Sequence, residues 1–577
     1  MAMLLLLLAV SSVEGLALQS EAALAGKIDS QIPWLHDGTE LIDMELAAGH
    51  HPQFPEAREA KNLRVDRRPL LERAQAKARD EKKLILWYVP RVVGLHMYRA
   101  VLPDRYMKTA VFTDPRVVRF VSDRFVPLRM CADGIAGVKP FEFVEPGFLF
   151  LTPDGKVVHT LDRLRTFNAA WFLAAFQEVL RANPGYGSAD VAPLPTSEAE
   201  TQYGLAVRDA WSGKDPAPRL RDILKRHPDS PWAWRAAANV VKAEDTLPLG
   251  PLAHHLEDIY APLPKGAPTS TRLPAKDVAS AAKGAVDFLL RAQWEDGSWR
   301  DARYGYWPDA EILPNVWGAI TALAALALLE WGDPRADAAL AKADAYLKNP
   351  ANFAKDRHEE CYAHAFRLHY FARRGDTTSM AKVVARLAAI QEDEGFWSHE
   401  YANAFSTAAV VHALATARAA GAEVPDYLLQ RAADALLSAR DPQGRQPYRV
   451  GEKPDNDKST SARTALCELA LKGCGRPADV AGGVERYWKF IKNMEGVRIY
   501  DYHSDGRLAG FFYFHAAFHT LEAARTLPEP ARGTSLKRFR ETLLQIPEID
   551  GSFIDSHEIG KSYGTAVALL MLARSRE

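Results

Sequence analysis

The C-terminal half of the chain alternates between apolar segments and more polar, amphipathic segments, each long enough for a helix. The apolar, Ala-rich segments begin near residues 317, 362, 405, 461, 514 and 563. The amphipathic segments precede them, at about residues 275–293, 335–348, 378–391, 426–440, 478–492 and 535–545. A helix that is apolar on all sides must be buried, whereas an amphipathic helix can cover it from outside. The pattern therefore predicts six inner and six outer helices.

The same alternation favours a closed ring over an open stack. An open solenoid needs polar caps at both ends, but the last apolar segment, residues 563–574, is as apolar as the others. Consecutive apolar segments start 43 (362 to 405) to 56 (405 to 461) residues apart, which is room for two helices and two loops. We therefore expect an all-α, double-walled ring over residues 275–577.

Residues 66–190 follow a different pattern, that of an α/β domain. Residues 84–89 and 125–129 are apolar runs typical of buried parallel strands. Residues 145–151 and 157–160 flank an Asp154-Gly155 turn, which predicts a hairpin. Helices are expected at about residues 70–82, 114–122 and 168–182, followed by a short helical spacer (195–245) and a Pro-rich linker (246–274).

The first residues of the chain predict export. Leu4 to Val10 form an apolar run that is too short to span a bilayer and is followed by small residues. We therefore expect a signal peptide over residues 1–17 and an irregular leader segment over residues 18–65; an uncleaved anchor is the alternative. No later run approaches about 20 apolar residues, so no transmembrane span is expected. The predicted location is periplasmic or secreted.

Composition narrows the range of partners. Lys plus Arg (72) balance Asp plus Glu (73), and 47% of residues are hydrophobic, so the chain is globular and is not expected to bind nucleic acid. The four cysteines include no CxxC pair, so a disulfide framework is not expected. A hydrophobic small molecule or a peptide remains as the expected ligand.

The loops between the predicted outer and inner helices carry a recurring sequence. Residues 293–299 read QWEDGSW, and residues 391–397 (QEDEGFW) and 545–553 (QIPEIDGSF) are degenerate copies. This sequence resembles the QW motif of squalene-hopene cyclases, whose helical-hairpin repeat is similar to that of protein prenyltransferase β subunits. The resemblance covers residues 275–577 and implies an (α/α)6 toroid. The Gln would cap an outer helix, and the aromatic ring would stack on the neighbouring repeat.

The α/β domain resembles the thioredoxin fold, with a βαβ unit, a hairpin and a helix in that order and Pro146 at the place of that family's cis-proline. Where thioredoxins carry CxxC, this chain has Pro90 to Met97 without a cysteine. Thiol–disulfide exchange needs a thiolate nucleophile, so the resemblance implies a redox-inert module that offers a surface to a protein partner. The expected fold class is multidomain, an α/β thioredoxin-like domain followed by an all-α (α/α)6 toroid.

The catalytic signatures of the related families are incomplete in this chain. Squalene-hopene cyclases use an Asp of a DxDD motif, whose closest match here ends in Asp457-Lys458, where the Lys would lower the carboxyl pKa. Prenyltransferases hold zinc with an Asp, a Cys and a His, but Cys361 and His515 fall in the second and fifth repeats, too far apart to share an ion. No metal and no cofactor is therefore expected.

The repeat phase places polar and aromatic residues where the inner helices begin, at the mouth of a predicted cavity. The expected ligand-binding residues are Asn315, Trp317, Glu360, Tyr362, His364, Arg463, Tyr513, His515 and Tyr563. His364, His515 and Asp457 are also candidates for acid–base catalysis. Such a lining suits a hydrophobic ligand, including an isoprenoid; aromatic side chains that only fill the centre are the alternative. We expect a binding or scaffold protein, with an enzyme (a polysaccharide lyase or hydrolase, or a divergent terpenoid cyclase) as the alternative.

Overall fold

The computed structural model describes residues 32–36, 68–90, 102–130, 147–161, 167, 169–187, 198–211, 214–228, 230, 232, 277–303, 313–356, 358–399, 401–452, 457–490, 513–548, 550–556 and 558–576. Contacts divide the chain into two compact units. The first contains the elements from β1 to α8, and the second contains the helices from α10 to α22. The predicted signal peptide (1–17) and Pro-rich linker (246–274) lie outside the described residues.

The first unit is built on a five-stranded sheet in the order β1-β3-β2-β4-β5. Strands β1 (Leu35–His36), β3 (Phe125–Arg129) and β2 (Leu84–Val89) run parallel. Strands β4 (Gly147–Leu151) and β5 (Val157–Leu161) form an antiparallel hairpin, and β4 is also antiparallel to β2. Every side chain of β2 is buried, as expected of an apolar strand covered on both faces.

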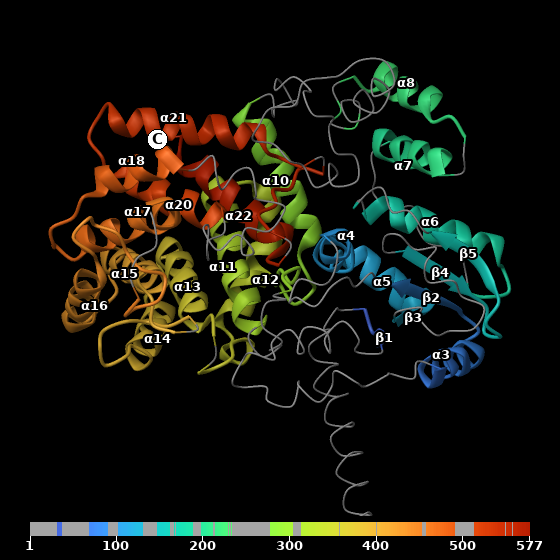
Figure 1. The fold of residues 1–577 in the computed structure, drawn as a ribbon, viewed down its shortest axis with the longest axis horizontal. Helices are drawn as coiled ribbons and strands as arrows, with labels where there is room; N and C mark the ends of the chain where they lie inside the picture. Colours follow the sequence, from blue (N-terminus) through green and yellow to red (C-terminus); the bar gives the residue numbers. More distant parts are fainter. Residues whose placement is uncertain are drawn as a thin grey trace, which may run out of the picture. The chain divides into compact units, whose positions relative to one another are not determined.

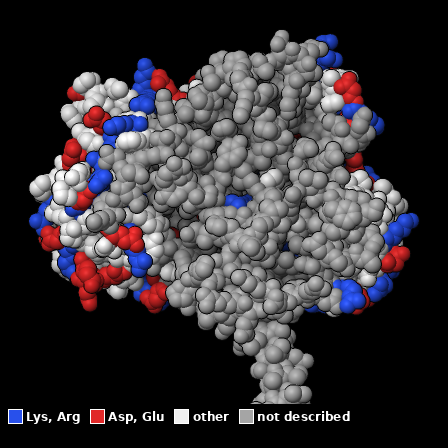
Figure 2. All heavy atoms as spheres, viewed as in Figure 1, with Lys and Arg blue, Asp and Glu red and all other residues white. Residues whose placement is uncertain are grey.

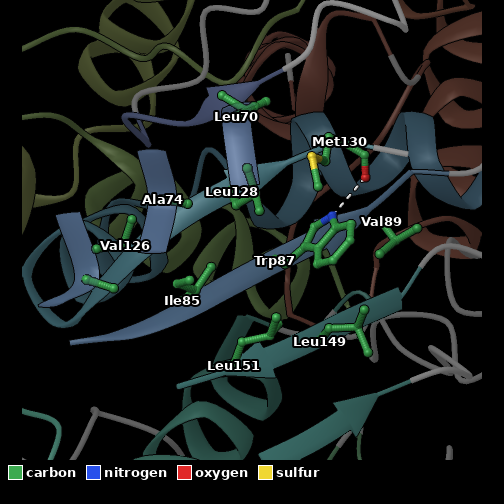
Figure 3. Close-up of a cluster of buried hydrophobic side chains, with 11 residues drawn as sticks. Leu70, Ala74, Ile85, Trp87, Val89, Val126, Leu128, Met130, Leu149 and Leu151 are labelled. Carbon is green, nitrogen blue, oxygen red and sulfur yellow. Dashed lines mark hydrogen bonds between the residues drawn. The ribbon is translucent and has the colours of Figure 1, made fainter. Parts of the chain in front are cut away.

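The helices of this unit cover the sheet. They are α3 (Arg68–Glu81), α4 (Leu102–Tyr106), the short π-helix η4 (Met107–Val111), α5 (Pro115–Arg124) and α6 (Ala169–Ala182). Figure 3 shows the core beneath α3, where Trp87 donates its indole N–H to the carbonyl of Met130 (2.8 Å). Helix α7 (Glu198–Trp211) packs on α6, and α8 (Ala217–Arg226) packs on α7, so these two helices from the expected spacer belong to this unit.

One strand departs from the sequence prediction. The leader over residues 18–65 is expected to be irregular, but Leu35 and His36 pair with Leu128 and Arg129 as an edge strand. Two residues are too few to show a period of two, so the pattern could not reveal them. Pro146, the expected cis-proline, lies outside the described residues.

The described part of the second unit contains both predicted sets of helices, each at its expected place (Figure 1). The amphipathic helices are α10 (Val278–Ala292), α12 (Asp337–Lys348), α14 (Thr377–Ala389), α16 (Asp426–Ala439), α18 (Val480–Phe490) and α21 (Ala531–Gln545). The apolar helices are α11 (Leu313–Trp331), α13 (Glu360–Arg374), α15 (Ala404–Ala419), α17 (Asp457–Gly473), α20 (Tyr513–Arg525) and α22 (Gly560–Arg574).

The apolar helices contact one another in a closed cycle. Each packs on the next in the order α11, α13, α15, α17, α20, α22, and α22 packs on α11. The amphipathic helices pack on this cycle from outside, and α14, α16 and α21 lie at the periphery of the unit in Figure 1. Arg574 at the end of α22 forms an ion pair with Glu330 of α11 (2.7 Å), which joins the last repeat to the first. The described apolar helices of the second unit thus form a closed set of contacts, and we refer to these helices with the amphipathic helices packed on them as the ring.

The surface charge of this unit and the burial of its most apolar helix agree with the sequence. Acidic and basic side chains are mixed over its visible described surface (Figure 2), in agreement with a net charge of -1. Among the described helices, only α11 is long and apolar enough to cross a membrane, and 83% of its most apolar stretch is buried inside the protein. The hydrophobicity of α11 is therefore accounted for by its place in the core.

Candidate functional site

The Gln-to-aromatic loops hold neighbouring repeats in register. Gln293 donates from Nε2 to a carbonyl of its own loop (3.0 Å) and to the carbonyl of Ala339 in the next outer helix, α12 (2.8 Å). Trp299 is fully buried and donates from Nε1 to the carbonyl of Leu289 in α10 (2.9 Å). The loop thus joins one outer helix to the next.

The third repeat uses the same contacts, and the fourth repeat keeps one of them with a different residue. Gln391 and Trp397 repeat the bonds of the first loop. In the fourth repeat Gln446 stands where the first and third repeats have tryptophan, and its amide donates to Leu436 O, ten residues back, as Trp397 does to the carbonyl ten residues before it. The sequence conceals this copy of the motif because the aromatic ring has been replaced by an amide that keeps the hydrogen bond.

Two residues after the aromatic position of the first, third and sixth loops lies a polar side chain. This side chain bonds to the start of the preceding inner helix or to the residue just before it. Asp301 accepts a hydrogen bond from Ser562 N in α22 (2.7 Å), and Asp555 accepts from the first two N–H groups of α20. Burial raises the pKa of Asp301 to about 6. In the third repeat His399 takes this place, and its Nδ1 donates to Glu359 Oε1, just before α13 (2.8 Å).

Glu360 and His364, both predicted to bind ligand, lie in the wall between α13 and its outer neighbours. Arg386 of α14 donates to both carboxylate oxygens of Glu360 (2.6 and 3.0 Å). Arg367 donates to His364 Nδ1 (3.0 Å), so the imidazole carries its proton on Nε2 and donates it to Glu360 (3.2 Å). Burial opposes ionisation of Glu360, but the bonds from His364 and Arg386 lower its pKa to about 2. These side chains have structural partners.

Other predicted site residues hold loops. Asn315 donates to Ala354 O and accepts from Ala354 N (both 3.0 Å). Trp317 donates to a carbonyl of the first repeat's loop (3.2 Å), and the fully buried Arg463 donates to a carbonyl of the fourth (2.8 Å). The side chain of Asp457 lies outside the described residues. Their predicted role in ligand binding stays a prediction.

Tyr362 and His515 meet inside the ring. They belong to α13 and α20, which are separated by two helices in either direction around the cycle, yet their rings are 5.7 Å apart, edge to face. Tyr362 keeps some accessible surface, and His515 is 8% exposed. Tyr513 and Tyr563 are buried at the starts of α20 and α22. Of the predicted residues, the structure thus brings Tyr362 and His515 together across the centre.

Three further histidines continue inward from this contact. His519 lies one turn after His515 on α20, with the rings 4.6 Å apart. His412 of α15 follows at 5.9 Å from His519, and His369 of α13 lies 4.8 Å from His412. We call His369, His412, His515 and His519 the histidine column. Among the described residues, neither ring nitrogen of His519 has a hydrogen-bond partner, and neither does Nδ1 of His369 or His412.

Charged groups lie next to the column, near the C-terminal ends of α20 and α22. Arg574 forms ion pairs with Glu522 (2.9 Å) and Glu330 (2.7 Å), and His412 Nε2 lies 4.0 Å from Glu522. Burial lowers the pKa of His412 to about 4, against the attraction of Glu522, and lowers that of His515 to about 3. Burial also places the pKa values of His369 and His519 well below the usual range. The column is therefore neutral at pH 7.

An aromatic rim lies on the other side of Tyr362, formed by His399, Tyr401, Phe405 and Tyr448. Neighbouring rings are 5.2 to 6.2 Å apart, and Tyr362 lies 6.3 Å from His399. Tyr401 and Tyr448 are partly exposed, and the Arg449 guanidinium lies over the ring of Tyr401 (5.0 Å). The aromatic rim therefore keeps part of its surface accessible near Tyr362.

Sequence reasoning identified His515 but missed the other members of the column. His369 lies seven residues after Tyr362 and His412 seven after Phe405, so both share a helix face with a residue near the mouth. That spacing is the signal that could have revealed them. Among the described residues, no three His, Cys, Asp or Glu side chains are placed to hold a metal ion together.

Comparisons with known proteins find only weak structural similarity. No family model matches the chain, and no curated protein matches it. Solved structures similar to it include a protein from Actinoplanes (17% identity, TM-score 0.36, covering 52% of this chain and all of that one). Another is the type II terpene cyclase MstE from Scytonema (15% identity, TM-score 0.34, covering 53% of this chain and 98% of that one).

Proposed function

We propose that this chain is an exported binding protein whose helical ring, an α/α toroid of the squalene cyclase and prenyltransferase type, holds a hydrophobic or amphipathic ligand at its centre. The supporting observation is the contact of Tyr362 with His515 inside the ring, beside side chains that keep accessible surface at depth. His412 keeps 14% of its side chain accessible although it lies among residues of α13 and α20. Aromatic walls with a few polar groups are typical of small-molecule sites.

The first unit is proposed to be a redox-inert, thioredoxin-like module that binds a protein partner. Its support is the sheet order β1-β3-β2-β4-β5, with parallel strands on one side and an antiparallel hairpin on the other. Residues 90–97, where a thioredoxin has its CxxC, contain no cysteine. A thiol–disulfide exchange assay tests this module, and insulin reduction above background would contradict it.

The binding function is tested by extracting the purified full chain with organic solvent and identifying retained molecules by mass spectrometry. We expect an apolar or amphipathic molecule in near-stoichiometric amount. A matched pair of variants localises it: Tyr362→Ala should lower retention, whereas Tyr427→Ala, at a side chain 53% exposed on α16, should leave retention unchanged. A protein that repeatedly emerges without such a molecule, and binds none when supplied, contradicts the proposal.

The Glu359–His399 pair favours an enzyme as the second candidate. The carboxylate fixes the imidazole from Nδ1, an arrangement that suits a general base, and Glu359 has a left-handed backbone (φ 65°) that is unusual for a residue other than glycine. Incubation with acidic polysaccharides and with a linear polyene, followed by product analysis, would show lyase, hydrolase or cyclase activity. Loss of that activity in His399→Ala would support this alternative.

A further inference from the structure

Three of the four residues of the histidine column, His369, His412 and His519, have unused hydrogen-bonding capacity. A neutral imidazole offers one N–H donor and one acceptor nitrogen. Among the described residues, His519 uses neither, and His369 and His412 leave Nδ1 without a partner. Side chains of His369 and His519 are 3% and 1% exposed, so bulk water does not satisfy them. A buried polar group left without a partner costs roughly 1–3 kcal/mol, so groups like these are normally satisfied by an ordered water or a bound molecule.

We propose that the histidine column recognises an uncharged, hydrogen-bonding end group of the ligand, such as the hydroxyl of a long-chain alcohol or the carbonyl of a ketone. This inference rests on the binding function proposed above and adds the chemical class of the ligand's end. An oxygen atom of that kind can accept from one imidazole N–H and, as a hydroxyl, donate to the next imidazole nitrogen. It can therefore replace a water without leaving the column unsatisfied.

The surrounding charges argue against an ionic end group. Arg574 is already paired with Glu522 and Glu330, and Glu522 also has Arg525 at 3.4 Å, so the local charges cancel. An anionic head group would lie in a buried site next to the Glu522 carboxylate. The arginines named here are already paired with carboxylates and would not neutralise the charge of the head group. Burial of an unpaired charge is far more costly than burial of a hydroxyl. The low pKa values of the column fit this view, because its imidazoles carry no compensating charge at pH 7.

The apolar side chains next to the column fit the rest of such a ligand. Tyr362 and Phe366 lie on the same face of α13 as His369, and their rings stack at 6.2 Å. Phe518 lies beside His519 on α20 (5.0 Å). Tyr362 and His412 both keep part of their surface accessible on this side of the ring. A chain along the aromatic groups would bring its end group to the imidazoles.

Four twelve-carbon probes that differ only at one end test the inference: dodecane, 1-dodecanol, dodecanoate and dodecyl phosphate. Binding of each to the full chain is measured by equilibrium dialysis at pH 7. We expect 1-dodecanol to bind at least tenfold more tightly than each of the other three. The double variant His412→Leu/His519→Leu should lose at least fivefold in affinity for the alcohol and keep its affinity for dodecane, which also shows that it is folded. His159→Leu, on strand β5 of the other unit, is the matched control.

The possible results separate the inference from the function on which it rests. Equal affinity for dodecane and 1-dodecanol, or tighter binding of either anion, overturns the inference and leaves the binding function standing. An alcohol preference that survives in the double variant places recognition elsewhere and also overturns the inference. If none of the four probes binds the wild-type chain, the proposed binding function itself fails.

Discussion

Helix α13 carries buried histidines in two different environments. In the wall of the ring, His364 accepts a hydrogen bond from Arg367 and donates one to Glu360. In the centre, His369 touches His412, and its Nδ1 has no partner among the described residues. The two residues are of the same type, are five positions apart and are both buried. His364 and His369 therefore differ in whether their buried nitrogens have hydrogen-bond partners. This difference, more than residue type or burial, distinguishes a structural residue from a candidate functional one.

The wall depends most strongly on its buried tryptophans. Trp397→Ala removes a fully buried ring and its bond to Leu387 O (2.8 Å), and we expect it to lower the free energy of unfolding by about 3–5 kcal/mol. Urea denaturation at pH 7 measures the loss. Tyr427→Ala, at a side chain 53% exposed, is the control and should change stability by less than about 0.5 kcal/mol. A loss below about 1 kcal/mol for Trp397→Ala would mean that the loops do not hold the repeats together.

The column should make stability sensitive to mild acid. The pKa of His412 is about 4 in the folded chain, because burial outweighs Glu522 while Arg574 and Arg525 oppose protonation; its ordinary value is 6.5. Between these values the unfolded chain binds more protons, so stability present above pH 6.5 is lost as the pH falls towards 4. We expect His412→Leu to remove about 2–3 kcal/mol of this loss. Urea midpoints at pH 7, 5.5 and 4.5 measure it, and an unchanged slope in the variant would contradict the burial of a neutral His412.

Acid should lower the stability of the wall at a lower pH than it affects the column. Glu360 has a pKa of about 2 in the folded chain and an ordinary value of 4.5, so its contribution is complete above pH 4.5 and is lost as the pH falls towards 2. We expect Glu360→Gln to lower the free energy of unfolding by about 2 kcal/mol at pH 7. The variant should also weaken the dependence of that free energy on pH, but only below pH 4.5. Asp426→Asn, at an 86% exposed side chain, is the control. A Glu360→Gln effect centred at pH 6 instead would show that the two regions are not electrostatically separate.

The sequence predicts the elements of the ring better than its site. The apolar and amphipathic segments indicate all of the described inner and outer helices, because one strong period extends over each. The site residues are harder, because the repeat phase puts Glu360, Tyr362 and His364 at the same end of α13 without saying which side each occupies. Only the partners distinguish them: Arg386 from α14 engages Glu360, whereas His515 from α20 meets Tyr362. Such partners are far apart in the sequence, and no local pattern contains them.

Replacement of a histidine by leucine should change stability in different directions in the wall and in the histidine column. His364→Leu leaves Arg367 and Glu360 each short of a buried partner, so we expect a loss of about 1–2 kcal/mol. His519→Leu removes two ring nitrogens that have no partner among the described residues and keeps most of the buried apolar volume, so we expect it to be neutral or to stabilise the ligand-free chain by about 1 kcal/mol. Urea denaturation of both variants after ligand extraction measures the sign. If His519→Leu is as destabilising as His364→Leu, the column is satisfied within the folded protein and has no spare hydrogen bonds for a ligand.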